Sequence, residues 1–216
     1  MVEKGFSASY WLKQTGDTHK PVIGVPTRRD GEGNTVTEVE RQEAAGAPGA
    51  SEARIRPAGD QDLPAITRIH NEGIEDRVAT LDVEPYTVEE KAEEFALVGP
   101  QDPMLVAEIR NEVVGWASLH PFSRRKAYKG VKELSIYISR PWRRQGIGAR
   151  LLEALLKEAK RHRIYKVILN VLSSNEPALA LYRQMGFREV GVYLNQGRID
   201  GRWTDILIME KHLRLG

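Results

Sequence analysis

The sequence predicts an α/β protein built around one mixed β-sheet with helices on both faces. Apolar runs with a period of two, or with no polar interruption, alternate with stretches whose apolar residues recur at helical spacing. Their order from about residue 54 to 212 is β-α-α-β-β-β-α-β-α-β-β, beginning with a strand at 54–58. Residues 133–162 are the most informative stretch, because they combine a short strand, a basic glycine-rich loop and a long amphipathic helix.

Two helices and a β-hairpin are expected after the first strand. Asp60 is the expected N-cap of a helix with apolar residues at helical spacing. Residues 87–90 read Thr-Val-Glu-Glu, a capping box that opens a second helix running through Leu97. Two strands, at 104–109 and 113–119, then flank a short polar turn and form the hairpin.

The central strand and helix carry the clearest periodic signals. Leu134, Ile136 and Ile138 alternate with more polar residues, and Pro141 cannot continue a central ladder, so the strand should end before it. From Ile147 the apolar residues follow helical spacing, and basic residues crowd the last turns, where cations suit the negative end of the helix dipole.

The remaining elements complete the sheet. Residues 165–172 form an almost unbroken apolar strand, which is expected to be buried on both faces. Asn175 is the expected cap of a helix that stops at Gly186. The last two strands are expected at 187–193 and 203–209.

Length and composition set limits on the class of protein. A chain of 216 residues with 41% hydrophobic residues supports one domain with a real core. Residues 1–53 are rich in Gly, Thr, Glu and Ala without sustained periodicity, so we expect a disordered or loosely attached extension ahead of a domain at 54–216. A net charge of only +2 does not indicate a nucleic-acid partner.

The absence of cysteine, the spacing of the histidines and the hydropathy pattern exclude further classes of protein. The chain has no cysteine, which removes disulfides, thiolate metal sites and a cysteine nucleophile and fits a reducing compartment. None of the five histidines has a spacing typical of a metal site, so no metal is expected. Neither a signal peptide nor an apolar run of about 20 residues is visible, so we expect a soluble, cytoplasmic protein.

The glycine-rich turn at 146–148 has the features of an anion cradle, because it feeds the N-terminus of a helix with unpaired N–H groups. A Rossmann fingerprint is excluded, since Leu151 stands where a third glycine or alanine is needed. A P-loop is excluded by the lack of Gly-Lys-Ser/Thr. Between residues 124 and 150, nine cations face the single acid Glu133, a field that would attract a polyphosphate. A purely structural turn with a solvated basic flank remains the alternative.

The loop Arg143-Arg144-Gln145-Gly146-Ile147-Gly148 resembles the pyrophosphate-binding loop of the GCN5-related N-acetyltransferase (GNAT) superfamily. Within it, the chain is similar to the phosphinothricin/L-amino-acid N-acetyltransferase branch. The stretches that carry this resemblance are 55–58, 77–80, 128–129, 133–138, Asn175 with Leu181, Gly186 and Phe187, and 201–205. The resemblance implies the GNAT fold, acetyl-CoA as co-substrate without a metal, and a homodimer.

The resemblance also implies two catalytic residues. Forming an amide from a thioester needs a base that takes a proton from the amine, and the departing thiolate benefits from an acid. Glu133 matches the base of this branch; its alternative role is an ion pair with Lys132 or Arg140. Tyr182 matches a tyrosine that protonates the coenzyme A sulfur in many members, and its alternative role is an aromatic packed on the helix.

The binding residues are implied in the same way. Those implied for the cofactor are Ile136, Tyr137 and Ile138 through their backbone, Arg143, Arg144, Gln145, Gly146, Ile147 and Gly148 at the diphosphate, and Asn175 on the coenzyme A arm. Lys129 and Thr80 are implied for the acceptor, Lys129 through the substrate carboxylate. The branch commonly has arginine there, and lysine loses the bidentate fork. His120, at a strand end, is expected to be a solvated or capping histidine, with a place bordering the site as the alternative, and Trp203 and Asp205 are expected to be structural.

The leading hypothesis is an acetyl-CoA-dependent N-acetyltransferase acting on a small amino acid or analogue, such as phosphinothricin or methionine sulfoximine. The acceptor amine would attack directly in a ternary complex, without an acyl-enzyme. One alternative keeps the fold and changes the acceptor to an antibiotic, a polyamine or a protein N-terminus. Another is a non-catalytic coenzyme A-binding module. Neither a membrane nor a nucleic acid is an expected partner, since the basic stretch has no interleaved aromatic residues.

Overall fold

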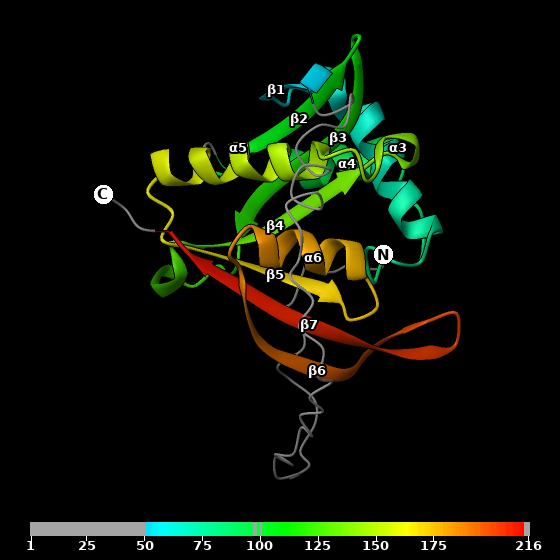
Figure 1. Cartoon of the computed structure of the whole chain (residues 1–216), viewed down its shortest axis with the longest axis vertical. Coiled ribbons are helices and arrows are strands. Elements are labelled where there is room, and N and C mark those ends of the chain that lie inside the picture. Colours follow the sequence, from blue (N-terminus) through cyan, green and yellow to red (C-terminus); the bar gives the residue numbers. More distant parts are fainter. Residues whose placement is uncertain (1–50, 97–98, 100, 214–216) are drawn as a thin grey trace, which may run out of the picture.

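The computed structural model describes residues 51–96, 99 and 101–213, and they form one seven-stranded sheet with helices on both faces (Figure 1). The strands are β1 (Arg54–Pro57), β2 (Met104–Ile109), β3 (Glu112–Pro121), β4 (Val131–Ile138), β5 (Lys166–Leu172), β6 (Arg188–Ile199) and β7 (Arg202–His212). The helices are α3 (Leu63–Glu75), α4 (Val88–Ala96), α5 (Ile147–Arg161) and α6 (Glu176–Gln184). The predicted element order is confirmed. The expected extension at 1–53 lies, up to residue 50, outside the described residues.

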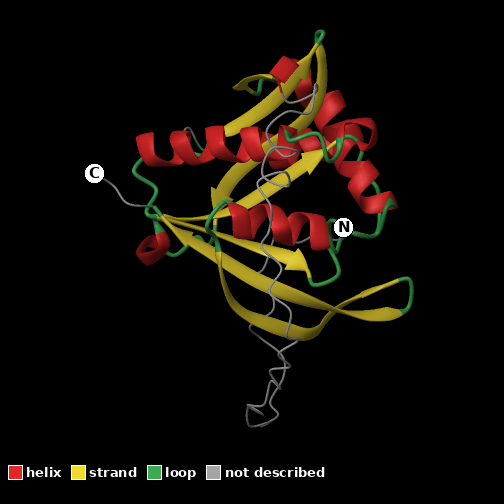
Figure 2. Cartoon of the chain, viewed as in Figure 1, coloured by secondary structure: helices red, strands yellow, loops and turns green. Residues whose placement is uncertain are grey.

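The strand order is β1-β2-β3-β4-β5-β7-β6, and every neighbouring pair is antiparallel except β4 and β5, which are parallel. Neighbouring residues of β3 enter different cores: Val114 and Ala117 pack with α5 and α6, whereas Val113 and Trp116 pack with α3. Helices α5 and α6 therefore cover one face of the sheet, and α3 covers the other (Figure 2).

The local signals for helix ends are largely confirmed. Thr87 and Glu90 form the capping box ahead of α4, each side chain accepting a hydrogen bond from the other residue's N–H at 3.1 and 3.0 Å. Asn175 caps α6 by accepting the N–H of Ala178 at 3.2 Å. Gly186, at φ 77°, follows the end of α6 in the left-handed conformation that glycine adopts at low cost.

The predicted cap of the first helix is wrong. Asp60 opens a short 3₁₀ turn, and α3 begins only at Leu63. The carboxylate that anchors this turn belongs to Asp62, which accepts the N–H of Gly59 at 2.9 Å. Arg56 of β1 holds both oxygens of Asp62, at 2.7 and 2.9 Å. Arg56 thus pairs with Asp62, the buried aspartate of the two, while Asp60 stays exposed.

One strand prediction is confirmed with one exception, and another needs correction. Strand β5 is buried on both faces apart from Asn170 in its middle, which is exposed. Strand β6 continues to Ile199, beyond the predicted end at 193, so β6 and β7 form a long hairpin that extends past the neighbouring strands (Figure 2). Two register shifts, at Glu189/Gly191 and Tyr193/Gly197, interrupt its pairing with β7.

The central strands part from each other, and this positions the site. Only three residues of β4 pair with β5, and the last pair is Glu133 with Ile168. Beyond it, β4 continues for five residues beside β3, while β5 continues beside β7, and the two strands diverge visibly (Figure 1). The remaining part of β4 thus has a strand on one side only.

Replacing Asp62 with asparagine should lower the free energy of unfolding by about 2 kcal/mol at pH 7, the cost of losing hydrogen bonds between charged groups. The hydrogen bonds from Arg56 hold the pKa of Asp62 below its usual range. A lowered carboxyl pKa stabilises the fold above the unfolded-state value, so the difference between wild type and Asp62→Asn should shrink below about pH 4. Chemical denaturation between pH 7 and pH 3 measures this.

Asp60→Asn is the matched control, because Asp60 is exposed in the same turn. It should change the free energy of unfolding by less than about 0.5 kcal/mol. Equal effects of the two substitutions would contradict the assignment of Asp62 as the anchor.

Candidate active site

Glu133 lies where β4 and β5 part. Its backbone pairs with Ile168 of β5 and His120 of β3, and its side chain is buried at 8% exposure. The side-chain amide of Asn170 donates to Oε1 of Glu133 at 2.9 Å. Neighbouring Lys132 points to the opposite face of the strand and pairs with the buried Asp102. The predicted base therefore sits at the start of the divergence, and a hydrogen bond from β5 reaches its carboxylate.

The register of β3 against β4 decides where the backbone groups of β4 point. Ser139 donates its N–H to the carbonyl of Val114 at 2.9 Å, so these residues form a hydrogen-bonded pair. Such pairs alternate along antiparallel strands. Tyr137 therefore directs its N–H and C=O at β3, whereas Ile136 and Ile138 direct theirs at the side from which β5 has departed. Of the three predicted backbone ligands, Ile136 and Ile138 have the orientation that a ligand between the strands needs.

The glycine-rich loop forms the N-terminus of α5. Gly146 is the N-cap residue, at φ 76°, and the helix begins at Ile147. The N–H groups of a first helical turn have no partner within the helix, so they are available to an anion. Gln145 steadies the turn by donating its side-chain amide to the carbonyl of Pro141 at 2.8 Å. Arg144, at φ 61°, is exposed beside it.

Arg143, predicted to bind the diphosphate, is engaged within the protein. Its Nε donates to the carbonyl of Ile138 at 2.9 Å, and its Nη1 donates to Asp76 at 2.5 Å. Arg140 donates to the other oxygen of Asp76 at 2.9 Å. Burial raises the pKa of Asp76, but the hydrogen bonds from both arginines outweigh it and leave the pKa below the ordinary value. Arg143 thus ties the loop to β4 and to the end of α3, and Arg144 is the exposed cation of the pair.

Tyr182 enters from α6. Its side chain is buried at 7% exposure, and its ring lies 5.8 Å from that of Phe187. Burial raises the pKa of Tyr182, so the phenol stays protonated at neutral pH. Tyr182 belongs to the core cluster on the α5 face, against which Ile136 and Ile138 of β4 also pack. Tyr182 therefore packs in the core and also places a phenol near the parted strands.

The loop between α3 and α4 brings Thr80 to β4. Thr80 donates its hydroxyl to Asp82 at 2.9 Å and accepts the N–H of Asp82 at 3.1 Å. Nε2 of His70, a buried residue of α3, lies 3.5 Å from the carboxylate of Asp82. The ring of His70 also contacts Tyr137 and Trp116, at centroid distances of 4.7 and 5.9 Å. A polar chain inside an aromatic cluster thus fixes Thr80 on the α3 face of β4.

Three predicted residues lie at the margin. Lys129 is exposed at the end of a 3₁₀ turn, four residues before Glu133 and outside β4. His120 stands opposite Glu133 on the same face of the sheet and is half-buried. Trp203, on β7, is 64% exposed. The structure brings Glu133, Ile136, Ile138, Gly146, Tyr182 and Thr80 around the parted strands, and leaves Lys129 further out.

Sequence reasoning missed Asn170, His70 and Asp82. Asn170 had a signal, since it is the single polar residue inside the apolar run 167–172. The other two are separated by twelve residues and meet only because the loop after α3 folds back over it. No local sequence pattern predicts such a pair.

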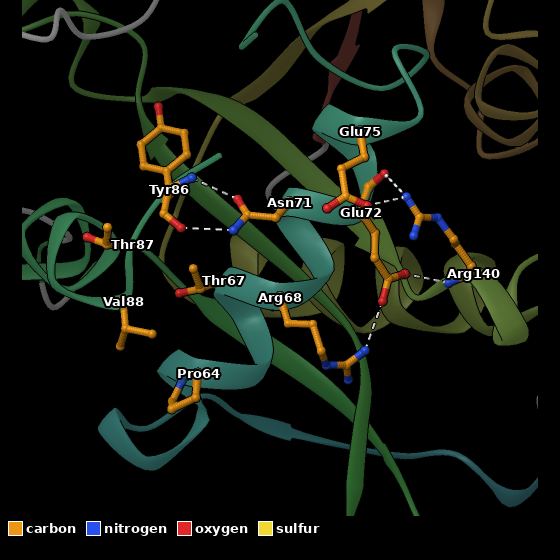
Figure 3. Close-up of a pocket in the computed structure, with 10 residues that line it drawn as sticks. All are labelled: Pro64, Thr67, Arg68, Asn71, Glu72, Glu75, Tyr86, Thr87, Val88 and Arg140. Atoms are coloured by element: carbon orange, nitrogen blue, oxygen red, sulfur yellow. Dashed lines mark hydrogen bonds and ion pairs between the residues drawn. The ribbon is translucent and has the colours of Figure 1, made fainter. Parts of the chain in front are cut away.

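A separate groove of about 540 Å³ lies on the outer side of α3 (Figure 3). Residues of α3 line it together with the segment 86–88 and Arg140. Asn71 and the backbone of Tyr86 exchange two hydrogen bonds, and Glu72 receives hydrogen bonds from Arg68 and from the backbone of Arg140. None of the predicted site residues lines this groove, so it is distinct from the candidate active site.

Within the described part of the chain, no group of three or more His, Cys, Asp or Glu side chains is arranged to hold a metal ion. No helix among the same residues is both long and apolar enough to cross a membrane.

Comparison with known proteins identifies the family. Residues 66–187 match the model of the acetyltransferase (GNAT) family. The chain therefore belongs to the GNAT acetyltransferase family and is an N-acetyltransferase. The family match accounts for the fold, for the glycine-rich loop at the start of α5 and for the parted central strands.

Two relatives indicate which branch of the family the chain resembles. A putative phosphinothricin acetyltransferase of Bacillus subtilis is 34% identical over 160 residues, which cover 74% of this chain and 98% of the relative. An L-methionine sulfoximine/L-methionine sulfone acetyltransferase of Pseudomonas aeruginosa is 31% identical over 163 residues, covering 74% and 95%. The predicted branch of the superfamily is confirmed by these two relatives.

Two solved structures have the same fold. A phosphinothricin acetyltransferase from Sinorhizobium meliloti, in complex with acetyl-CoA, matches with a TM-score of 0.73 and 32% identity, over 76% of this chain and 90% of that one. A ribosomal-protein-alanine N-acetyltransferase from Brucella melitensis matches with a TM-score of 0.71 and 34% identity, over 74% and 99%.

Proposed function

We propose that the protein transfers the acetyl group of acetyl-CoA to the amine of a small amino acid or analogue of the phosphinothricin and methionine sulfoximine type. The observation that carries this proposal is the buried Glu133 at the point where β4 and β5 part, next to backbone groups of β4 that no strand covers. The relatives named for phosphinothricin and methionine sulfoximine support the acceptor class.

The residues present fit acetyl-CoA. The first-turn amides of α5 and the exposed Arg144 suit the diphosphate, and the left-handed Gly146 lets the backbone approach it closely. The N–H and C=O of Ile136 and the N–H of Ile138, whose carbonyl already accepts from Arg143, can pair with the amides of the pantetheine arm as an added strand would. Asn175 accepts the N–H of Ala178 through its oxygen, so its amide nitrogen can donate to the arm.

Acetyl-CoA supplies an activated acyl group, and the chain supplies the proton transfers. Glu133 accepts a proton from the amine, which frees the nitrogen lone pair for attack on the thioester carbon. An N–H of β4 at Ile136 or Ile138 stabilises the negative charge that develops on the carbonyl oxygen. As the C–N bond forms, the C–S bond breaks, Tyr182 donates its proton to the departing sulfur, and the second proton that the nitrogen loses restores the phenol of Tyr182. The chain has no cysteine, which fits direct attack rather than a cysteine-linked acyl-enzyme.

A protein N-terminus is the second candidate acceptor. The structure titled ribosomal-protein-alanine N-acetyltransferase is 34% identical to this chain, the same identity as the Bacillus relative. The two candidate acceptors differ in the group attached beyond the reactive amine, which is a free carboxylate in one and a peptide chain in the other. A panel of acceptors therefore separates them.

We also propose that two copies pair through the β6 edge of the sheet. Strand β6 is the last strand of the sheet and has a neighbour on one side only. It exposes Val190, Val192, Tyr193 and Leu194, at 48 to 73%, close to the exposed Trp203 of β7. Exposed apolar residues on an edge strand are typical of association surfaces, and a twofold axis lets identical edges meet.

Wild-type protein mixed with acetyl-CoA should release thiol in the presence of phosphinothricin or methionine sulfoximine. The panel should also contain spermidine, an aminoglycoside and a short peptide beginning with alanine. Preference for the amino-acid analogues supports the first proposal, and preference for the peptide supports the second candidate. Saturable acetyl-CoA binding with no thiol release from any amine would instead indicate the non-catalytic module.

Glu133→Gln should lower kcat/KM by about 10²- to 10⁴-fold, the usual contribution of a general base, and leave acetyl-CoA affinity unchanged. Glu93→Gln, on the exposed side of α4, is the control for removing one carboxylate. Initial rates of thiol release measure both variants. Unchanged turnover in Glu133→Gln would remove the base role.

The two loop glycines should respond differently to alanine. Gly146→Ala places a side chain at φ 76° and should cost about 1 kcal/mol of stability and about tenfold in acetyl-CoA affinity. At Gly148 an added methyl would meet Leu181 and Ile138 only at 3.5 and 3.8 Å, so Gly148→Ala should be nearly neutral in both. Calorimetric titration and thermal unfolding test this, and the opposite ranking would contradict the loop assignment.

Leu194→Asp should convert the dimer to a monomer in analytical ultracentrifugation, because it buries a charge in the proposed apolar contact. Val88→Asp, at another exposed apolar position, is the matched control and should leave the sedimentation coefficient unchanged. A wild-type protein that sediments as a monomer at all concentrations would overturn the proposed pairing.

A further inference from the structure

Strand β5 carries one side chain that its packing does not require. Leu169 and Val171 are buried at 1% and 5% exposure, whereas Asn170 between them is exposed. Its neighbour across the sheet is Ile208 of β7, an apolar residue. Asparagine is disfavoured in strands, where β-branched residues fit the pleated surface better. The reason for an asparagine at this position therefore has to be sought in its polar contacts.

The contact that stands out is with Glu133. Nδ2 of Asn170 lies 2.9 Å from Oε1 of Glu133, a normal hydrogen-bond distance. Asn170 is two residues beyond Ile168, the last residue of β5 that pairs with β4. The bond thus links the two central strands through side chains, immediately past the point where their backbone pairing ends.

We infer that Asn170 is a positioning residue, which holds the carboxylate of Glu133 in the orientation that receives the proton of the amine. This inference rests on the proposed role of Glu133 as the base. A glutamate side chain has three torsions, and a displacement of 1 Å at a reacting group can cost about 100-fold in rate. One hydrogen bond from a strand that is fixed independently, by its pairing with β7, removes much of that freedom.

The choice of an amide is chemically informative. Asparagine donates a hydrogen bond without titrating, so the link persists at every pH at which Glu133 is ionised. An aspartate at the same place would put two carboxylates within hydrogen-bonding distance, and two such groups resist carrying a charge each. The neutral donor therefore orients the base and does not compete for its proton.

Other titratable groups also lie on this face. His120 of β3 stands opposite Glu133. Lys166 of β5 donates to Glu210 of β7 at 2.5 Å, and Arg188 of β6 pairs with the same carboxylate. All four remain in wild type and variant alike, so a change that appears only when residue 170 is altered reports on that residue.

A double-mutant cycle with Glu133 is the first test. Asn170→Ala should lower kcat/KM by about 10- to 100-fold in the wild-type background, with acetyl-CoA affinity unchanged. In the Glu133→Gln background the same change should cost less than about twofold, because the group that Asn170 orients is already disabled. An equal loss in both backgrounds would show a merely structural role and overturn the inference.

The pH profile is the second test and uses the isosteric Asn170→Asp. Its acidic limb of kcat/KM should move to higher pH by about one unit or more, because a second carboxylate resists ionisation beside Glu133. Gln61→Glu makes the same amide-to-acid change at an exposed site beside β1 and should leave the profile unchanged. A profile of Asn170→Asp that superimposes on that of wild type would overturn the inference even if Asn170→Ala fails to fold.

These outcomes separate the inference from the proposed function. If Glu133→Gln is inactive and both tests at residue 170 are negative, Asn170 has no positioning role and the proposed function stands. If Glu133→Gln is fully active, or if wild type releases no thiol with any amine, the proposed function fails and the positioning role fails with it.

Discussion

The parting of β4 from β5 after Glu133 is the constraint on which the rest of the structure depends. Backbone N–H and C=O groups need partners, and beyond Glu133 those on one side of β4 have no strand beside them. Each remaining part of the two strands is kept in place from its outer side, β4 by β3 and β5 by β7. Helices α5 and α6 pack over one face of the divergence, and the loop after α3 reaches β4 from the other. A ligand that carries amide groups can form hydrogen bonds with these backbone groups of β4.

Periodicity and capping chemistry sufficed for the architecture. The order of elements, the capping box at Thr87, the Asn175 cap and the glycine stop at 186 were all readable, because each depends on residues close in the sequence. The error at Asp60 and Asp62 has a different cause. Both residues have the chemistry of a cap, and only the arrival of Arg56 from β1 distinguishes them.

The site was predictable in part. Glu133 and Gly146 carry local signals, a polar strand end and a glycine turn ahead of a helix. The engagement of Arg143 by Asp76, and the contact of His70 with Asp82, depend on segments that are separated in the sequence. The divergence of β4 and β5 cannot be predicted from the hydrophobic pattern, because apolar residues alternate with a period of two whether or not a strand is paired.

Asp76 connects two segments that serve different purposes. It ends α3, it holds both arginines of the loop before α5, and the chain directly after it leads to Thr80. The loop before α5 and the segment that leads to Thr80 therefore share a single anchor. An engineer who grafts the 77–82 segment of a relative onto this scaffold would have to keep a short acidic side chain at 76, or redesign the arginine loop with it.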